Sequence, residues 1–150
     1  MRAIIQNVNK ASIVIGNATY SGIGKGIVVY LGIAQGDKES DIHYIANKVL
    51  ELRIFANDGD KFDLSLSDIK GELLVISQFT LFADLTKGRR PYFGKAESPD
   101  RAEEIYNKFI TEVSRLYNQK SVKSGKFGAK MTIEQENLGP VTLILDSYNE

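Results

Sequence analysis

Residues 71–84, GELLVISQFTLFAD, begin as a near-continuous apolar run, and such a run predicts a strand that is buried on both faces. Ser77, Gln78 and Thr80 then interrupt the run around Phe79. In regular strand geometry Gln78 and Thr80 share one face, whereas Ser77 and Phe79 point to the other. A buried hydroxyl or amide costs about 1–3 kcal/mol if it is unpaired. These polar groups therefore either bond to a neighbouring backbone at a strand end or face a bound molecule.

Further strands are predicted on both sides of this run. Short segments rich in β-branched and other apolar residues predict strands over residues 3–8, 11–15, 27–34, 130–136 and 141–145. Glycine, asparagine and proline separate these segments and predict turns, including one over residues 137–140.

Two amphipathic helices complete the predicted fold. An apolar stripe at helical spacing predicts the first over residues 37–55, with Asp37 or Ser40 capping its start. The second begins after Ser98, because Ser98 is a good N-cap and Pro99 suits the first helical position. Two strand-rich halves with one helix each predict a single α+β domain that has an antiparallel or mixed, barrel-like sheet.

The composition excludes several classes of protein. A chain of 150 residues with 43% hydrophobic residues is most simply one globular domain over residues 1–150. It has no cysteine and only one histidine, His43, so thiolate sites and two-histidine metal sites within one chain are excluded. Nineteen basic residues balance nineteen acidic ones, which argues against nucleic-acid binding by overall charge. With no signal peptide and no membrane span in the sequence, we expect a cytoplasmic protein without membrane partners.

Thr80 invites interpretation as a nucleophile, but its surroundings in the sequence argue against that role. An activated hydroxyl needs a general base within hydrogen-bond reach. No histidine or carboxylate lies in the strand near Thr80. Ser77, Gln78 and Thr80 therefore resemble hydrogen-bonding groups that hold a substrate more than members of a catalytic triad.

Lys87, Arg89 and Arg90 belong to the densest basic stretch of the chain, TKGRRPYF over residues 86–93. Basic side chains beside glycine and aromatic residues suit contact with nucleic-acid phosphates and stacking on bases. The same composition is also typical of a solvated loop. The sequence alone leaves these two interpretations open.

Short motifs are spread over essentially the whole chain, and they are Met1-Arg2-Ala3, Gln6-x-Val8, Leu31-Gly32, Leu52-Arg53-Ile54-Phe55, Ser77-Gln78-Phe79-Thr80-Leu81, Lys87-Gly88-Arg89-Arg90-Pro91, Gly125-x-Phe127-Gly128-Ala129-x-Met131 and Asn137-x-Gly139-Pro140-Val141-Thr142. In their order and spacing these motifs resemble the D-aminoacyl-tRNA deacylase family. The resemblance implies an enzyme that hydrolyses the ester between a D-amino acid and the 3′ end of tRNA, and that also removes mischarged glycine. It implies neither a metal nor an organic cofactor.

The resemblance also implies a role for each motif. The catalytic pocket for the terminal adenosine and the ester would contain Ser77, Gln78, Phe79 and Thr80. The substrate-binding residues would be Ala129, Met131, Gly139 and Pro140, and the tRNA-binding residues would be Lys87, Arg89 and Arg90. The family is homodimeric, and its Gly-Pro pair, joined by a cis bond, enters the partner's active site and leaves no room for an L side chain.

The chain departs from the family pattern at Asn7, where the family usually has an arginine that helps to hold the Gly-Pro loop. Asparagine is shorter and uncharged, so that charge-assisted bond is lost unless another residue replaces it. A deacylase of relaxed chirality is therefore one alternative. The others are a tRNA-binding module without catalysis and a purely structural dimerisation domain.

Overall fold

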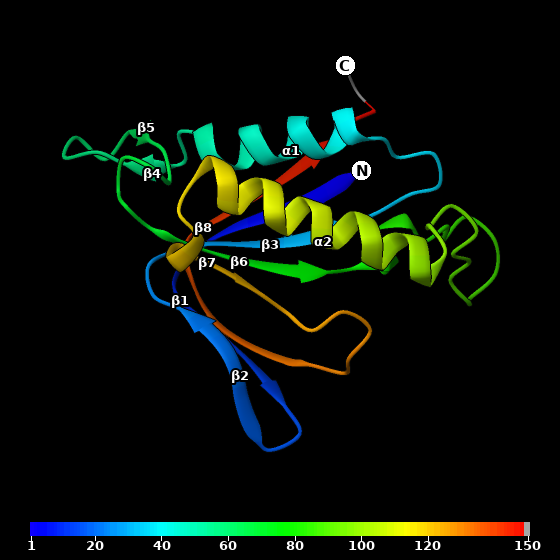
Figure 1. The fold of residues 1–150 in the computed structure, drawn as a ribbon. Coiled ribbons are helices and arrows are strands. Elements are labelled where there is room, and N and C mark those ends of the chain that lie inside the picture. Colours follow the sequence, from blue (N-terminus) through cyan, green and yellow to red (C-terminus); the bar gives the residue numbers. More distant parts are fainter. Residues whose placement is uncertain (149–150) are drawn as a thin grey trace.

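A curved six-stranded sheet with two helices on one face forms the body of the protein in the computed structural model, which describes residues 1–148 (Figure 1). The strands of this sheet are β1 (Arg2–Ile15), β2 (Ala18–Ile23), β3 (Gly26–Gly32), β6 (Glu72–Ser77), β7 (Val122–Ser124) and β8 (Thr132–Asp146). The helices are α1 (Glu39–Glu51) and α2 (Pro99–Leu116). A separate short hairpin consists of β4 (Phe55–Ala56) and β5 (Phe62–Leu64). Helical turns of the 3₁₀ type occupy Phe79–Phe82 and Gln119–Ser121.

The sheet is mixed, as the sequence predicted. Its strand order is β2-β1-β3-β6-β7, and β8 pairs with the other edge of β1. β1 runs antiparallel to β2, β3 and β8, whereas β3, β6 and β7 are mutually parallel. The long strands β1 and β8 bend away from the helices, so the sheet curls into a nearly closed, barrel-like shape (Figure 1). The predicted α+β class with two amphipathic helices is confirmed.

Both faces of the central sheet are buried. On the helix side Leu73 and Val75 of β6 pack into the core shared with α1 and α2. On the opposite side Leu74 and Ile76 belong to a second apolar cluster inside the curl of the sheet. All four side chains are at most 1% exposed. The apolar run therefore forms the doubly buried strand that its composition predicted.

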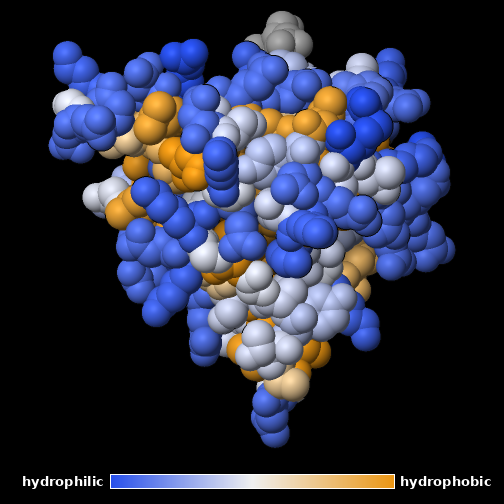
Figure 2. All heavy atoms as spheres, turned by 60° about the vertical axis from the view of Figure 1, so that its left-hand side comes forward, coloured by the Kyte–Doolittle hydropathy of each residue, from blue (hydrophilic) through white to orange (hydrophobic). Residues whose placement is uncertain are grey.

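Figure 2 shows one face on which hydrophilic residues predominate and apolar residues reach the surface in small separate groups. Within residues 1–148 no helix combines the length and the apolar character needed to cross a membrane.

Two predicted strand breaks were wrong. Asn9 and Lys10 were expected to separate two short strands, but β1 runs through them because β8 pairs with it on both sides of this point. Gly139 and Pro140 were expected to lie in a turn between strands, but they lie inside β8, joined by a cis peptide bond. Both interruptions are tolerated because β1 and β8 are long and pair with each other on either side of them.

The strand geometry expected for residues 78–80 was also wrong. β6 ends at Ser77, and the chain then turns into the 3₁₀ segment Phe79–Phe82. At the first helix, the predicted caps were wrong as well: Lys38 is the N-cap, and its N–H donates to the Asp41 carboxylate at 2.7 Å. Asp37 instead binds the buried Met1 ammonium group at 2.6 Å. Ser98 and Pro99 take the predicted positions at the start of α2.

Candidate functional site

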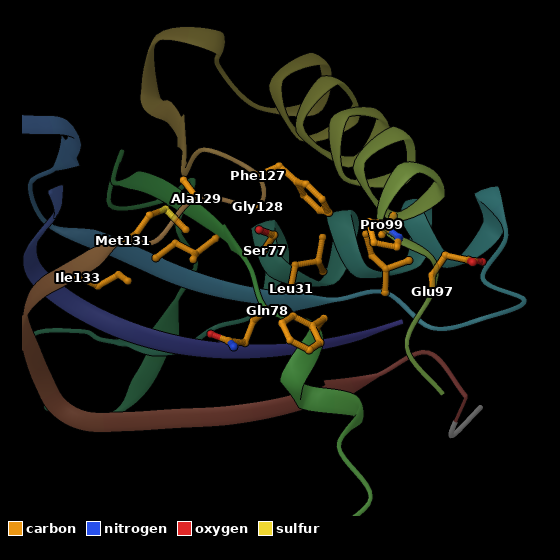
Figure 3. A pocket seen from close by; sticks show the side chains of 14 residues that line it. Leu31, Ser77, Gln78, Glu97, Pro99, Phe127, Gly128, Ala129, Met131 and Ile133 are labelled. Atoms are coloured by element: carbon orange, nitrogen blue, oxygen red, sulfur yellow. The ribbon is translucent and has the colours of Figure 1, made fainter. Parts of the chain in front are cut away.

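A pocket of about 470 Å³ opens where the parallel strands β3 and β6 end side by side (Figure 3). Leu31 pairs with Ser77 in the last register position of these strands. The carboxyl ends of parallel strands are a common place for ligand sites, because the chain diverges there and leaves a crevice. The lining residues are Leu31, Ile33, Ile76, Ser77, Gln78, Phe79, Glu97, Pro99, Ala102, Phe127, Gly128, Ala129, Met131 and Ile133.

Three of the four predicted catalytic residues line this pocket, namely Ser77, Gln78 and Phe79. Thr80 lies beside it, where its Oγ1 accepts a hydrogen bond from Gln78 Nε2 at 2.5 Å. The Phe79 ring is 56% exposed and contacts Phe93 edge to face, with 4.9 Å between ring centroids. The turn after β6 therefore brings an amide, a hydroxyl and an aromatic ring to one rim of the pocket.

Within residues 1–148, no general base is hydrogen-bonded to Thr80. Among the described residues, no aspartate, glutamate or histidine side chain is hydrogen-bonded to its hydroxyl. Glu97 is the carboxylate that lines the pocket, but it accepts the Ser98 N–H at 2.7 Å and points away from Ser77 (Figure 3). The geometry thus agrees with a substrate-holding role for Gln78 and Thr80 better than with an activated threonine.

The opposite wall is the loop over residues 125–129, which is tied to β6. Gly125 N–H donates to Val75 O at 2.8 Å. The Tyr106 hydroxyl of α2 reaches the same carbonyl at 2.8 Å and Gly125 O at 3.3 Å. Burial raises the pKa of Tyr106, so its hydroxyl remains a donor at neutral pH. These bonds hold Phe127 and Ala129 against the pocket, and Met131 follows on the same wall.

Gly139 and Pro140 do not line the pocket of their own chain. They are exposed on β8, and Gly139 has a φ of 116°, a conformation that side chains disfavour. A Cβ atom at Gly139 would meet Val141 Cγ2 at 2.7 Å. Glycine is therefore required here on steric grounds.

Lys87, Arg89 and Arg90 are exposed and likewise do not line the pocket. Their loop follows the 3₁₀ turn, and its base is closed by paired backbone bonds between Asp84 and Tyr92. Thr86 donates two hydrogen bonds to the Asp84 carboxylate, and these bonds lower the pKa of Asp84. The basic side chains thus project from a closed loop that starts at the pocket rim.

The sequence interpretation missed several lining residues, which are Leu31, Ile33, Glu97, Pro99 and Ala102. Pro99 and Ala102 were assigned to a helix, and Leu31 and Ile33 to a strand. Leu31, Pro99 and Ala102 were correctly placed in their elements, whereas Ile33 lies just beyond the end of β3. No local pattern indicates that the end of β3 and the start of α2 meet beside β6. Knowledge of the parallel pairing of β3 with β6 would have placed Leu31 beside Ser77.

Known proteins are similar to this chain over nearly its full length. A sequence model described as D-Tyr-tRNA(Tyr) deacylase matches residues 4–146. A D-aminoacyl-tRNA deacylase of Dehalococcoides mccartyi is 50% identical over 149 residues, which cover 98% of this chain and 95% of the relative. One of Aquifex aeolicus is 48% identical over 147 residues, with 98% of each chain covered.

A solved structure of a c-Myc DNA Unwinding Element Binding Protein superimposes with a TM-score of 0.94 at 38% identity. The superposition covers 98% of this chain and 99% of that one. The sequence model and the identity to curated relatives each span nearly the full length. On these grounds the chain belongs to the D-Tyr-tRNA(Tyr) deacylase family.

Proposed function

We propose that residues 1–150 form one deacylase domain that hydrolyses the ester between a D-amino acid and the 3′ end of tRNA, and that also removes mischarged glycine. The observation that carries this proposal is the pocket at the ends of β3 and β6, rimmed by Ser77, Gln78 and Phe79. Its apolar floor and few polar groups suit a nucleoside that carries a small acyl group. Membership of the family supplies the substrate class. We place this activity in the cytoplasm, where aminoacyl-tRNA is used.

Within this function, the pocket residues bind the terminal adenosine and the aminoacyl ester. Ser77, Gln78 and Thr80 supply hydrogen bonds, and Phe79 supplies an exposed ring. Ala129 and Met131 form the wall opposite them. Ala129 is small enough to leave space for the acyl group.

The basic loop contacts the acceptor end of the tRNA in this proposal. Lys87, Arg89 and Arg90 are exposed, and Tyr92 beside them is 69% exposed. Lysine and arginine bind phosphates, while an exposed aromatic ring stacks on bases. The loop begins at the pocket rim, so a strand that enters the pocket passes close to these side chains.

Selection against L-amino acids requires a second copy of the chain. Within residues 1–148, β8 pairs with β1 alone, so its other edge has no strand partner. Leu143 and Ile144 of β8 are 37% and 72% exposed. In the homodimer that we propose, this surface meets its counterpart, and Gly139 and Pro140 enter the partner's pocket. Their carbonyl groups then face the substrate's amino group and exclude an L side chain by steric conflict.

Hydrolysis proceeds, in this proposal, by attack of water assisted by the 2′-hydroxyl of the tRNA. The backbone N–H groups of Phe79 and Thr80 have no acceptor among the described residues. Such groups stabilise a developing oxyanion, and each is worth about 10²–10³ in rate where this has been measured. Thr80 orients the substrate and does not attack it.

Substitution of Thr80 by alanine tests this assignment. We expect Thr80→Ala to keep most of the deacylation rate, because the hydroxyl has no base to activate it. The rate is measured on D-tyrosyl-tRNA in a single turnover, with Thr80→Ser as the control that retains the hydroxyl. Abolished turnover in Thr80→Ala, with folding and tRNA binding intact, would show that the hydroxyl is the nucleophile.

Release of amino acid from charged tRNA tests the function itself. We expect free D-tyrosine from D-tyrosyl-tRNA and glycine from glycyl-tRNA, and no release from L-tyrosyl-tRNA. Binding of the tRNA without release of D-tyrosine would instead indicate a module that only binds nucleic acid, a class to which the name of the 38% identical protein points. Comparable hydrolysis of L-alanyl-tRNA would indicate a deacylase of relaxed chirality.

A further inference from the structure

The Gly139-Pro140 pair lies in an interruption of the ladder between β1 and β8. Gln6 pairs with Thr142, and the next pair is Val8 with Asn137. Four residues of β8, numbers 138–141, therefore stand opposite the single residue Asn7. We call these four residues the 138–141 bulge. Since ladder bonds do not fix the bulge, other bonds must set its position.

Asn7 does not supply such a bond. Its side chain is 2% exposed and points to the helix-covered face of the sheet, where Nδ2 donates to Ile54 O at 2.5 Å. Its Oδ1 is buried and has no hydrogen-bond partner among the described residues. The Asn7 side chain is therefore bonded to Ile54 and not to the bulge.

A chain of side-chain hydrogen bonds on the other face of the sheet joins the two ends of the bulge. Tyr30 of β3 donates its hydroxyl to Gln135 Oε1 at 2.9 Å. Gln135 Nε2 donates to Asn137 Oδ1 and to Gln6 Oε1, both at 2.8 Å. Gln6 Nε2 in turn donates to Thr142 Oγ1 at 3.1 Å. Asn137 and Thr142 are the residues immediately before and after the bulge.

We propose that Tyr30, Gln135 and Gln6 are positioning residues that hold the 138–141 bulge by its two ends and thereby set the selectivity for D over L substrates. This inference rests on the proposed function. These residues touch no substrate; they act through the position of Gly139 and Pro140.

The bonds of this chain run in one direction, from the Tyr30 hydroxyl through Gln135 and Gln6 to Thr142. The Tyr30 hydroxyl is half-buried, and burial raises its pKa, so it stays protonated and can donate at neutral pH. With the Tyr30 hydroxyl as donor, the Gln135 oxygen faces Tyr30 and the Gln135 amide nitrogen donates to Asn137 and Gln6. Gln6 then receives at its oxygen and has only its amide nitrogen left for Thr142. Tyr30 on β3 is thus connected, through amides on β8 and β1, to both ends of the bulge.

Tyr30 also connects the bulge with the pocket. It packs against the apolar cluster inside the sheet, together with Met131 and Ile133. Both of these residues line the pocket, and Ile133 lies two positions before Gln135 (Figure 3). The amide chain is therefore anchored on the same wall that receives the substrate.

Three variants test the proposal on D-tyrosyl-tRNA and L-tyrosyl-tRNA. Gln135→Leu removes three bonds of the chain, so we expect the ratio of D to L hydrolysis to fall about tenfold while the D rate changes less than about threefold. Tyr30→Phe removes one bond and should lower the ratio less. Because both act through Gln135, the double variant should be no worse than Gln135→Leu alone.

Asn9→Leu is the matched control. It also removes an amide bond between β1 and β8, from Asn9 Nδ2 to Glu136 Oε1 at 2.9 Å, but this bond is outside the chain. We expect it to leave the ratio unchanged. An unchanged ratio in Gln135→Leu, or an equal loss in Asn9→Leu, would overturn the proposal.

Amide hydrogen exchange gives a readout that does not depend on activity. Exchange at Asn137 and Thr142, the paired residues that flank the bulge, should accelerate in Gln135→Leu and not in Asn9→Leu, because only the former frees the ends of the bulge. Unchanged exchange would overturn the proposal as well. If the wild type releases no D-tyrosine, the proposed function fails, and the exchange rates still decide whether the amide chain holds the bulge.

Discussion

The pocket and the 138–141 bulge, the two parts of the proposed site, are held in place by different kinds of bonds. The pocket floor lies on β3 and β6, whose backbone ladder is continuous up to Leu31 and Ser77. The bulge has lost its ladder and is bridged by side-chain amides. A ladder holds its strand whatever the side chains are, whereas an amide chain depends on each member. Substitutions at the pocket should therefore change turnover, and substitutions around the bulge should change selectivity.

The largest effect is expected where bulk is added to the pocket. Ala129→Phe places a ring where the acyl group would bind, so we expect turnover of D-tyrosyl-tRNA to fall by at least about 10²-fold. Steady-state kinetics measure the turnover, and the melting temperature shows whether the variant is still folded. Ala18→Phe adds the same bulk at an exposed position of β2 and should leave turnover unchanged. Normal turnover in Ala129→Phe would remove the pocket from the proposed site.

A smaller effect, on selectivity, is expected at the bulge. A methyl group at Gly139 would meet Val141 Cγ2 at 2.7 Å, and the residue has a φ of 116°. Gly139→Ala should strain the bulge by about 1–3 kcal/mol and reduce the D to L ratio about tenfold. Gly16→Ala is the matched control, because Gly16 also has a positive φ, 63°, but nothing lies within 4 Å of its added Cβ. Equal D to L ratios in Gly139→Ala and Gly16→Ala would contradict the proposal that the bulge sets selectivity.

Tyr106→Phe tests a part of the pocket that depends on a side-chain donor. The variant loses the bonds to Val75 O and Gly125 O, which should lower the free energy of unfolding by about 1 kcal/mol. We expect turnover to fall only a few-fold, since Gly125 N–H still holds the loop to Val75 O. Urea denaturation measures the stability. Tyr44→Phe is the control, because no hydrogen bond of the Tyr44 hydroxyl exists within residues 1–148; an equal loss there would show that the Tyr106 bonds contribute nothing.

The smallest effect is expected in the helix layer, away from both parts. Glu112 of α2 accepts hydrogen bonds from Arg115, at 2.8 Å, and from His43 of α1, at 2.9 Å. Mainly because of the Arg115 bond, the pKa of Glu112 falls from 4.5 to about 2. A lowered pKa in the folded state means that the ionised carboxylate stabilises the protein above about pH 4.5, and that this contribution is lost as the pH falls toward 2.

Glu112→Gln should therefore lower stability at neutral pH by less than about 1 kcal/mol, as is usual for surface ion pairs. Its difference from the wild type should shrink when both are melted near pH 2.5. Glu103→Gln, on the same helix, serves as the control. Turnover and selectivity should be normal in both; a change in either would show that the helix layer is coupled to the site.

Much of the fold was predictable because its signals are local. The doubly buried β6 followed from its apolar run, and the start of α2 followed from Ser98 and Pro99. The pairing of β1 with β8 was not predictable, because it joins residues more than a hundred positions apart. For that reason Asn9 and Lys10, and likewise Gly139 and Pro140, were taken for the ends of strands that in fact continue.

The candidate site was predictable in its motifs but not in its geometry. Ser77, Gln78 and Phe79 do meet at one pocket, yet the alternation expected for Gln78 and Thr80 failed because the chain turns after Ser77. Asn7 was expected to deprive the Gly-Pro pair of the charge-assisted bond that the family's arginine makes, unless another residue replaced it. The amide chain through Gln135 bridges that pair, and its members come from three strands that no single stretch of sequence connects.

The pairing of β1 with β8 has a consequence for how the protein is made. The two strands lie near opposite ends of the chain, and their ladder joins Arg2 to Asp146. Synthesis proceeds from the N-terminus at about 5–20 residues per second, and contacts between distant residues form late. The strands that form the floor of the pocket, β3 and β6, are therefore synthesised before the strand that carries Gly139 and Pro140. During translation, Ser77, Gln78 and Phe79 of the proposed pocket are thus made before the residues proposed to choose among substrates, and both parts of the site depend on the C-terminal strand for their completion.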